Sequence, residues 1–139
     1  MRKRIGNLDF DRASHSVYHL CAHVVFCVKF RRHILTSEKR DFLFVTLKEL
    51  AAQRNCEITE INGEEDHIHF LLRFPPTICL SDMVGALKSK SAAALIDRFG
   101  SFFWGKQSRT LWSSGFFLCS VGGATLDILK EYIENQGRA

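Results

Sequence analysis

The sequence predicts an α+β domain, built on one antiparallel sheet with helices on one of its faces. Two patterns support this prediction. Apolar residues recur at helical spacing in two internal segments and near the C-terminus, and the apolar or alternating runs between them have the length of strands. The chain has 139 residues, which is enough for one hydrophobic core and too few for two. We therefore expect residues 1–139 to form a single domain.

The predicted elements follow one another as strand, helix, strand, strand, helix, strand and helix. Residues 1–14 are polar and charged, and we expect a flexible basic arm there. The predicted strands are Ser16–Lys29, Cys56–Asn62, His67–Phe74 and Leu111–Val121, the last of them broken at Ser113–Gly115. The predicted helices cover residues 37–54, 81–99 and 124–137, with N-caps at Thr36 or Ser37 and at Ser81 or Asp82, and with Gly100 ending the second.

The first six elements have the β-α-β-β-α-β order of ferredoxin-like and RNA-recognition-motif-like (RRM-like) domains, and the C-terminal helix is an addition to that order. In this arrangement the helices cover one face of the sheet and leave the other face open. An open sheet face is a common platform for single-stranded nucleic acid. Because a fold does not fix a function, the residues on that face must decide it.

Composition limits the classes of function without selecting one. Lysine and arginine exceed aspartate and glutamate by 19 to 15, a net charge of +4, which is compatible with a polyanionic partner but also common in other proteins. The five cysteines form no C-x-x-C pair, so we expect free thiols in a reducing cytoplasm rather than disulfides or a zinc knuckle. No leader and no apolar stretch of about 20 residues is present, which predicts a cytoplasmic protein without a membrane span.

His67 and His69 are the first candidates for chemistry. They are two residues apart on a predicted strand, so both imidazoles project from the same face, about 7 Å apart, while Ile68 points into the core. Two such imidazoles converge on one metal ion if a third ligand approaches from outside. Two surface histidines without a ligand are the plainer interpretation of this short motif.

The C-terminal helix supplies further candidates. Tyr132 and Gln136 are four residues apart and lie on one stripe of that helix. A glutamine carbonyl is a hard oxygen ligand that suits Mg²⁺ or Mn²⁺ alongside imidazoles, and a phenol one turn away would lie beside a metal-bound phosphate. Without that context, both residues are ordinary half-buried helix positions.

Four stretches together carry a resemblance to a known family. They read SVYHLCAHVVFCVKFRR from Ser16, DHIHFLL from Asp66, LWSSGFFLCSVG from Leu111 and YIENQ from Tyr132. In order, spacing and total length the chain resembles the HUH superfamily. Within it, the chain is most similar to the single-tyrosine transposases (TnpA type) of small insertion sequences that move as single-stranded DNA.

The resemblance implies a role for each matching residue. His67 and His69 correspond to paired ligands of a divalent metal, Mg²⁺ or Mn²⁺, with Gln136 as the third ligand. Tyr132 corresponds to the nucleophile that forms a 5′-phosphotyrosine link and releases a 3′-hydroxyl. The resemblance further implies a DNA-associated prokaryotic homodimer. Its substrate would be single-stranded DNA with subterminal hairpins, and no nucleotide cofactor would be needed.

Five basic side chains are candidates for contacts with DNA phosphates, although a solvated surface is the alternative for each of them. They are Lys29, Arg31, Arg32, Lys88 and Lys90. Asp66 precedes His67 and either orients its ring or ends an acidic turn, and we favour the turn. Trp112 either stacks on a base or is buried, and burial is the commoner fate of tryptophan.

Three other functions remain open from the residues alone. A non-catalytic single-stranded nucleic-acid-binding module on an RRM-like sheet would need the basic and aromatic side chains but not the histidine, tyrosine and glutamine set. A metal-dependent hydrolase would use His67 and His69 to activate water, without a covalent intermediate. A replication initiator or relaxase of the HUH superfamily would be larger or carry features that are missing here.

Overall fold

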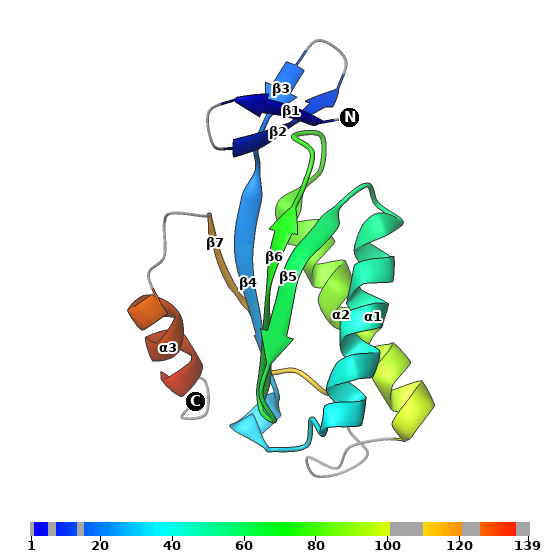
Figure 1. The fold of residues 1–139 in the computed structure, drawn as a ribbon. Helices are drawn as coiled ribbons and strands as arrows, with labels where there is room; N and C mark the ends of the chain where they lie inside the picture. Colours follow the sequence, from blue (N-terminus) through cyan, green and yellow to red (C-terminus); the bar gives the residue numbers. More distant parts are fainter. Residues whose placement is uncertain (1, 6–7, 14–15, 101–109, 121–125, 136–139) are drawn as a thin grey trace.

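The computed structural model describes residues 2–5, 8–13, 16–100, 110–120 and 126–135. Its main sheet confirms the predicted α+β fold (Figure 1). The four strands of this sheet are β4 (Cys21–Cys27), β5 (Glu57–Gly63), β6 (His67–Arg73) and β7 (Phe117–Ser120). They lie in the order β5-β6-β4-β7, and every neighbouring pair is antiparallel. With two helices between these strands, this is the ferredoxin-like arrangement expected from the sequence.

Helices α1 (Ser37–Ala52) and α2 (Leu80–Phe99) cover one face of the sheet (Figure 1). The predicted cap of α1 is confirmed, because the Thr36 hydroxyl accepts a hydrogen bond from the Lys39 amide at 3.4 Å. The predicted cap of α2 is wrong. That helix begins at Leu80, after a Cys79 that makes no side-chain capping bond. Gly100 ends α2 as expected, with a φ of 98° that favours glycine.

The hydrophobic core lies between these two helices and the sheet. Its fully buried members come from both strands in the centre of the sheet and from both helices: Val24, Phe26, Leu43, Leu47, Ile68, Leu72, Leu87 and Leu95. The Phe26 ring packs edge-on against Phe70 and tilted against Trp112, with ring centroids 5.5 Å apart in both pairs. This core fixes which face of each strand points away from the helices.

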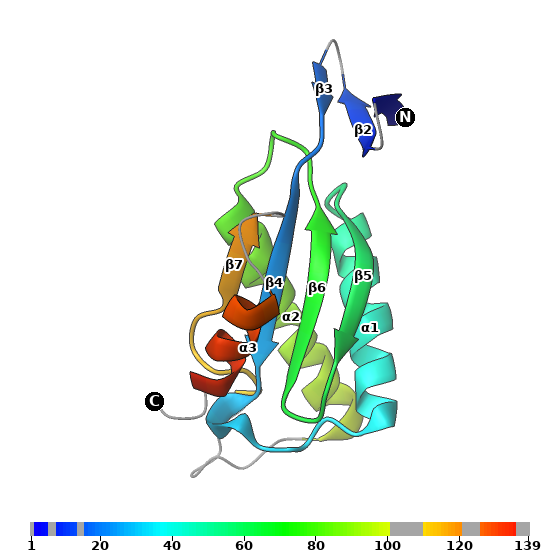
Figure 2. The ribbon, with the colours of Figure 1, turned by 60° about the vertical axis from the view of Figure 1, so that its left-hand side comes forward.

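Strand β6 shows the alternation clearly. Ile68, Phe70 and Leu72 point into the helix-covered core and are 2% exposed or less. His67 and His69 alternate with them, so they point to the opposite face. Helix α3 (Leu126–Asn135) lies on that opposite face, beside β4 and β7, as both ribbon views show (Figures 1 and 2).

The N-terminal segment differs from the prediction of a flexible arm over residues 1–14. Strands β1 (Arg2–Ile5), β2 (Leu8–Ala13) and β3 (Ser16–Tyr18) form a second antiparallel sheet. In the register of β1 and β2, Arg2 is the partner of Asp11 and Arg4 the partner of Asp9. Opposite charges at cross-strand positions stabilise a pair of strands. The charges that suggested a solvated arm therefore suit a hairpin.

Two predicted strands are shorter than expected. The predicted strand Ser16–Lys29 is divided into β3 and β4, because β3 pairs with β2 whereas β4 pairs with β6 and β7. A 3₁₀ turn, η1 (Lys29–Arg31), follows β4. At the other end of the chain, β7 begins only at Phe117, and Trp112 contributes a single bridge to Val28. The predicted break at Ser113–Gly115 accounts for this gap.

The predicted strands Cys56–Asn62 and His67–Phe74 are confirmed as β5 and β6, which pair as a hairpin that carries the histidine pair. Gly63, the last residue of β5, lies close to the backbone of β6 at the end of this hairpin. A Cβ atom at this position would lie 2.5 Å from the His67 carbonyl oxygen and 2.9 Å from the Ile68 Cγ2 atom. Only a residue without a side chain fits between these atoms without a shift of the backbone.

We expect Gly63→Ala to lower the free energy of unfolding by about 1–3 kcal/mol, the usual cost of forcing an atom into a packed site. Urea unfolding followed by circular dichroism measures this change. Gly85→Ala in α2 is the matched control, because a Cβ there meets nothing within 4 Å. It should be neutral, or stabilising by up to about 1 kcal/mol, since alanine favours a helix. Equal effects of the two substitutions would contradict the close-approach argument.

Candidate active site

The two histidines lie side by side on the face of β6 that the helices leave open. Their ring centroids are 5.9 Å apart and their planes are inclined by only 22°. His67 is 9% exposed, whereas His69 is exposed to solvent, and Ile68 between them is fully buried. The predicted same-face arrangement is therefore confirmed. Although His69 is exposed, part of its ring is shielded from water, which lowers its pKa, and the nearby His67 and His23 rings lower it further.

Asp66 holds the His67 ring in place, which corrects our interpretation of this residue as part of an acidic turn. Its Oδ1 atom lies 2.8 Å from His67 Nδ1, and the residue is only 6% exposed. An ionised carboxylate can only accept, so Nδ1 of His67 donates the proton of this hydrogen bond. The Nε2 atom of a neutral His67 then keeps its lone pair, as a metal-ligating imidazole requires.

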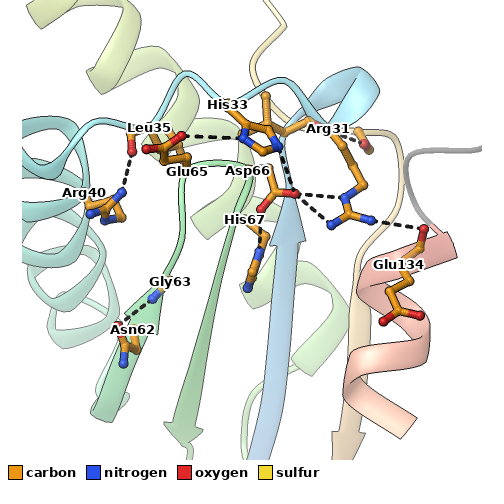
Figure 3. A network of polar contacts seen from close by, with 12 residues as sticks. Arg31, His33, Leu35, Arg40, Asn62, Gly63, Glu65, Asp66, His67 and Glu134 are labelled. Carbon is orange, nitrogen blue, oxygen red and sulfur yellow. Dashed lines mark hydrogen bonds and ion pairs between the residues drawn. The ribbon is translucent and has the colours of Figure 1, made fainter. Parts of the chain in front are cut away.

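The second carboxylate oxygen of Asp66 binds Arg31 (Figure 3). Nε and one terminal nitrogen of Arg31 lie 3.0 and 2.8 Å from Oδ2. Burial by itself would raise the pKa of Asp66, but the hydrogen bonds from His67 and Arg31 outweigh it and hold that pKa below its usual value. Asp66 is therefore a buried carboxylate that stays ionised between two donors.

Arg31 also reaches the tyrosine helix. Its other terminal nitrogen donates to the Glu134 carbonyl oxygen of α3 at 3.1 Å (Figure 3). The prediction that Arg31 contacts DNA did not anticipate this inward direction. The loop that carries it has an unusual backbone, since Phe30 and Arg31 have φ values of 60° and 49°. Two successive non-glycine residues in the left-handed region are strained and need support from their surroundings.

Tyr132 lies over β4 and β7 on the same open face. Its ring centroid is 4.9 Å from that of Phe117, and the residue is half-buried. Burial raises the pKa of Tyr132 to about 12, with a smaller contribution from the nearby Cys27. Cys27 is the cross-strand partner of His67. The phenol and the histidine pair are therefore on one face, separated by the Cys27 position.

The third predicted ligand, Gln136, lies outside the described residues. Helix α3 is described from Leu126 to Asn135, within the predicted range 124–137. Within the part of the chain that the structure describes, no group of three or more His, Cys, Asp or Glu side chains could hold a metal ion. The described residues thus fit a metal as a pair of imidazoles, one of them oriented by a carboxylate, and a further ligand must join them.

The five basic residues predicted to contact DNA do not form one surface. Lys29 and Lys88 line one cavity of about 430 Å³ between α2 and residues 110–114, and burial lowers the pKa of Lys88. Arg32 and Lys90 are exposed elsewhere. Trp112 borders the same cavity but is 2% exposed and donates from Nε1 to the Ser91 hydroxyl at 3.1 Å, so its predicted burial is confirmed.

The bonds from Asp66 to His67 and Arg31 are what sequence reasoning missed. One signal was available, because a carboxylate directly before a histidine pair is within reach of the first ring. No sequence signal shows that the side chain of Arg31, 35 residues earlier, would turn toward Asp66.

The prediction of free cysteines holds, since none of the five cysteines forms a disulfide. No helix among the described residues is long and apolar enough to span a membrane.

Solved structures share this fold. A crystal structure of a transposase candidate from Deinococcus radiodurans R1 superposes with a TM-score of 0.83 at 30% identity, over 93% of this chain and 99% of the other. A REP-associated tyrosine transposase, solved bound to a REP hairpin, has a TM-score of 0.56 at 12% identity, over 88% of this chain and 69% of the other, which shows a likeness of fold alone. The class that the fold defines is therefore that of transposase domains.

Sequence relatives identify the family. A family profile described as "Transposase IS200 like" matches residues 16–136. Transposases for insertion sequence element IS200 from Salmonella typhimurium and Salmonella typhi are each 34% identical over 128 residues, which is 92% of this chain and 84% of theirs. The ISDra2 transposase TnpA of Deinococcus radiodurans is 31% identical over 132 residues, 93% of this chain and 92% of that protein. The chain belongs to the IS200-like transposase family, as its resemblance predicted.

The half-buried phenol of Tyr132 yields a prediction for the protein without DNA or metal. Tyr132 should lose its proton at about pH 12, because burial disfavours the phenolate. An unfolded chain loses that proton near pH 10. The folded state thus holds the proton more tightly, and the resulting stability is present below about pH 10 and lost as the pH rises toward 12.

The measurement is the tyrosinate absorbance of the wild-type protein minus that of Tyr132→Phe, across this pH range. Phe117→Ala should lower the midpoint toward the ordinary value, because it removes the ring 4.9 Å away that shields the phenol. A wild-type midpoint near 10 would contradict the described position of Tyr132.

Proposed function

We propose that this chain cleaves and rejoins single-stranded DNA at insertion-sequence ends through a 5′-phosphotyrosine intermediate. The observation that carries the proposal is the common location of Tyr132 and the histidine pair. Both lie on the open sheet face, where the Tyr132 phenol is close to Cys27 and Cys27 is the cross-strand partner of His67. A phosphodiester bound beside the imidazoles would be close to the phenol.

The residue types suit phosphoryl transfer to tyrosine. In the cleavage step, the Tyr132 oxygen forms a bond to phosphorus, the bond from phosphorus to the 3′ oxygen breaks, and the 3′ oxygen leaves as a hydroxyl with one proton. The phenol loses one proton, so the step is balanced. One phosphodiester replaces another, and the 3′-hydroxyl of a second strand can reverse the step and join the strands. An activated water would end the reaction at hydrolysis instead.

His67 and His69 would hold a divalent cation, Mg²⁺ or Mn²⁺, together with Gln136. When bound, that cation would supply charge stabilisation to the phosphate oxygens and orient them for in-line attack. The described residues support this metal site through the two imidazoles that they place side by side. Asp66 fixes Nδ1 of His67 as the donor nitrogen, which leaves Nε2 for a ligand. The raised pKa of Tyr132 makes its deprotonation harder, so the phenol would need the nearby cation or a base to lose its proton.

The family and the positions of the basic side chains support a DNA hairpin as the substrate. The REP-associated relative was solved bound to a REP hairpin, and we propose that hairpins near the element ends are also bound here. Lys29 and Lys88, which line the cavity beside α2, are the best placed of the predicted phosphate contacts. Arg32 and Lys90 are exposed and can extend this contact. We do not assign a phosphate contact to Arg31, because its guanidinium already donates hydrogen bonds to Asp66 and to the Glu134 carbonyl.

The decisive test is a covalent adduct between the protein and labelled single-stranded element ends in the presence of Mn²⁺. We expect the adduct with the wild-type protein, its loss of at least about a thousandfold in Tyr132→Phe, and its loss when a chelator removes the metal. Tyr18→Phe is the control, because Tyr18 ends β3 in the other sheet. Denaturing electrophoresis measures all three.

The same assay separates the alternatives. A single-stranded nucleic-acid-binding module would bind the ends without any adduct. A metal-dependent hydrolase would cut them in Tyr132→Phe as efficiently as in the wild-type protein. Either result would sink the proposal.

We also propose that the protein acts as a homodimer in which subunits can share their sites. The tyrosine of one subunit would then act at the metal site of its partner as well as at its own. Mixing Tyr132→Phe with a His67→Ala, His69→Ala double variant should restore adduct formation to up to about a quarter of the wild-type amount, the statistical share of hybrid sites after random exchange. No recovery, with dimers confirmed by sedimentation, would show that each tyrosine serves its own subunit.

A further inference from the structure

A single guanidinium joins the two parts of the proposed active site. We propose that Arg31 is a positioning residue that couples the seating of the tyrosine helix α3 to the orientation of His67. This inference rests on the proposed function for its meaning, because it concerns the nucleophile and the metal ligand of that reaction. Its evidence is the set of contacts that Arg31 makes on either side (Figure 3).

On one side, Arg31 completes the bonding of a buried carboxylate. Arg31 donates twice to Asp66 Oδ2, at 3.0 and 2.8 Å, while His67 donates to Asp66 Oδ1 at 2.8 Å. Each oxygen therefore has its own donor, and the carboxylate plane is fixed between them. His33 is farther away, with its Nε2 atom 3.9 Å from Oδ2 and its side chain largely exposed. Without Arg31, the Asp66 carboxylate would be free to rotate, and the His67 ring with it.

On the other side, Arg31 binds the end of the tyrosine helix. The Glu134 carbonyl oxygen, 3.1 Å from the guanidinium, belongs to the last turn of α3, two residues beyond Tyr132. Carbonyls in the last turn have no partner within the helix and carry the negative end of its dipole, so a cation there is favourable. The ring pair of Phe117 and Tyr132 is a second contact of this helix with the sheet.

The backbone of the loop supports a dedicated role for Arg31. Phe30 and Arg31 both adopt left-handed conformations, which are costly for residues with side chains. Hydrogen bonds hold them there, from the Val28 amide to the Asp66 carbonyl at 2.8 Å and from the Arg31 amide to the Val28 carbonyl at 2.7 Å. The same loop is thus bound to Asp66 through both its backbone and its side chain, and this directs the guanidinium between Asp66 and Glu134.

A planar guanidinium can do this where an ammonium cannot. Arginine presents five N–H donors in a fixed fork, so it can bind a carboxylate along one edge and a carbonyl on the other. Lysine has a single compact charge and would pair with Asp66 or approach Glu134, but would not bridge them. The two functions can therefore be separated by substitution.

The test uses the full-length protein without DNA or metal and compares Arg31→Ala, Arg31→Lys and Arg32→Ala. Hydrogen exchange reports the seating of α3 through the amides of residues 126–135. Proton NMR reports the His67–Asp66 bond through the downfield imidazole proton of His67, assigned by its loss in His67→Gln. Arg32→Ala is the matched control, because it removes the same charge from the adjacent, exposed position.

We expect Arg31→Ala to speed the exchange of the α3 amides by about tenfold or more, the scale of one charge-assisted hydrogen bond, and to abolish the His67 resonance. Arg31→Lys should keep the resonance but leave α3 exchanging as fast as in Arg31→Ala. Arg32→Ala should change neither. An unchanged α3 or an unchanged resonance in Arg31→Ala overturns the coupling. If that variant unfolds, Arg31→Lys decides alone, and slow α3 exchange or a lost resonance in it overturns the proposal.

These outcomes are separate from those that test the proposed function. A wild-type protein that forms no DNA adduct would refute the transposition chemistry, whereas exchange and NMR on the DNA-free protein would still decide whether Arg31 couples its two neighbours. Conversely, unchanged exchange and NMR in a protein that does form the adduct would refute the coupling alone.

Discussion

The buried carboxylate of Asp66 is the group on which the polar geometry of the site depends. It lies at the end of the β5–β6 hairpin with 6% of its surface exposed, and a charge in such a place must be paired. The partners of this residue come from three directions: His67 at the start of β6, the Arg31 side chain from the loop after β4, and the Val28 amide, which binds the Asp66 backbone carbonyl. Removing His67 or Arg31 would leave part of a buried charge unsatisfied, and removing the Val28 bond would leave a backbone carbonyl unpaired. The loop, the strand and the ring orientation are for that reason fixed together.

A second constraint is the division of the sheet into two faces. The core side chains of β4 and β6 face α1 and α2, so the side chains that alternate with them, His67 and His69 included, face the other way. That face is free to carry chemistry because it contributes little to the core. Helix α3 rests on it through the Phe117–Tyr132 ring pair and the Arg31–Glu134 bond, both at its C-terminal half. Neither of these two contacts belongs to the hydrophobic core between the sheet and the helices α1 and α2.

The fold was largely predictable, because its determinants are local. Periodicity located both core helices and the β5–β6 hairpin, and the alternation around Ile68 placed His67 and His69 on one face. The failures were also physical. The strand over residues 16–29 is divided because its two parts have different partners, which a single chain segment does not reveal. The charged N-terminal segment forms the paired strands β1 and β2, so an excess of charge did not mean an absence of structure.

The sequence by itself determined the family, the order of the strands and helices around the main sheet, and the residue types of the site: two histidines on one strand face and one tyrosine on a late helix. Those properties depend on motifs and periodicity, which are written along the chain. Only the tertiary structure decided what Arg31 and Asp66 do. Their contact joins residues 35 positions apart, and the Arg31–Glu134 bond joins residues 103 apart. Such contacts depend on a strained loop and on the packing of α3 against the sheet, and neither leaves a pattern in the local sequence.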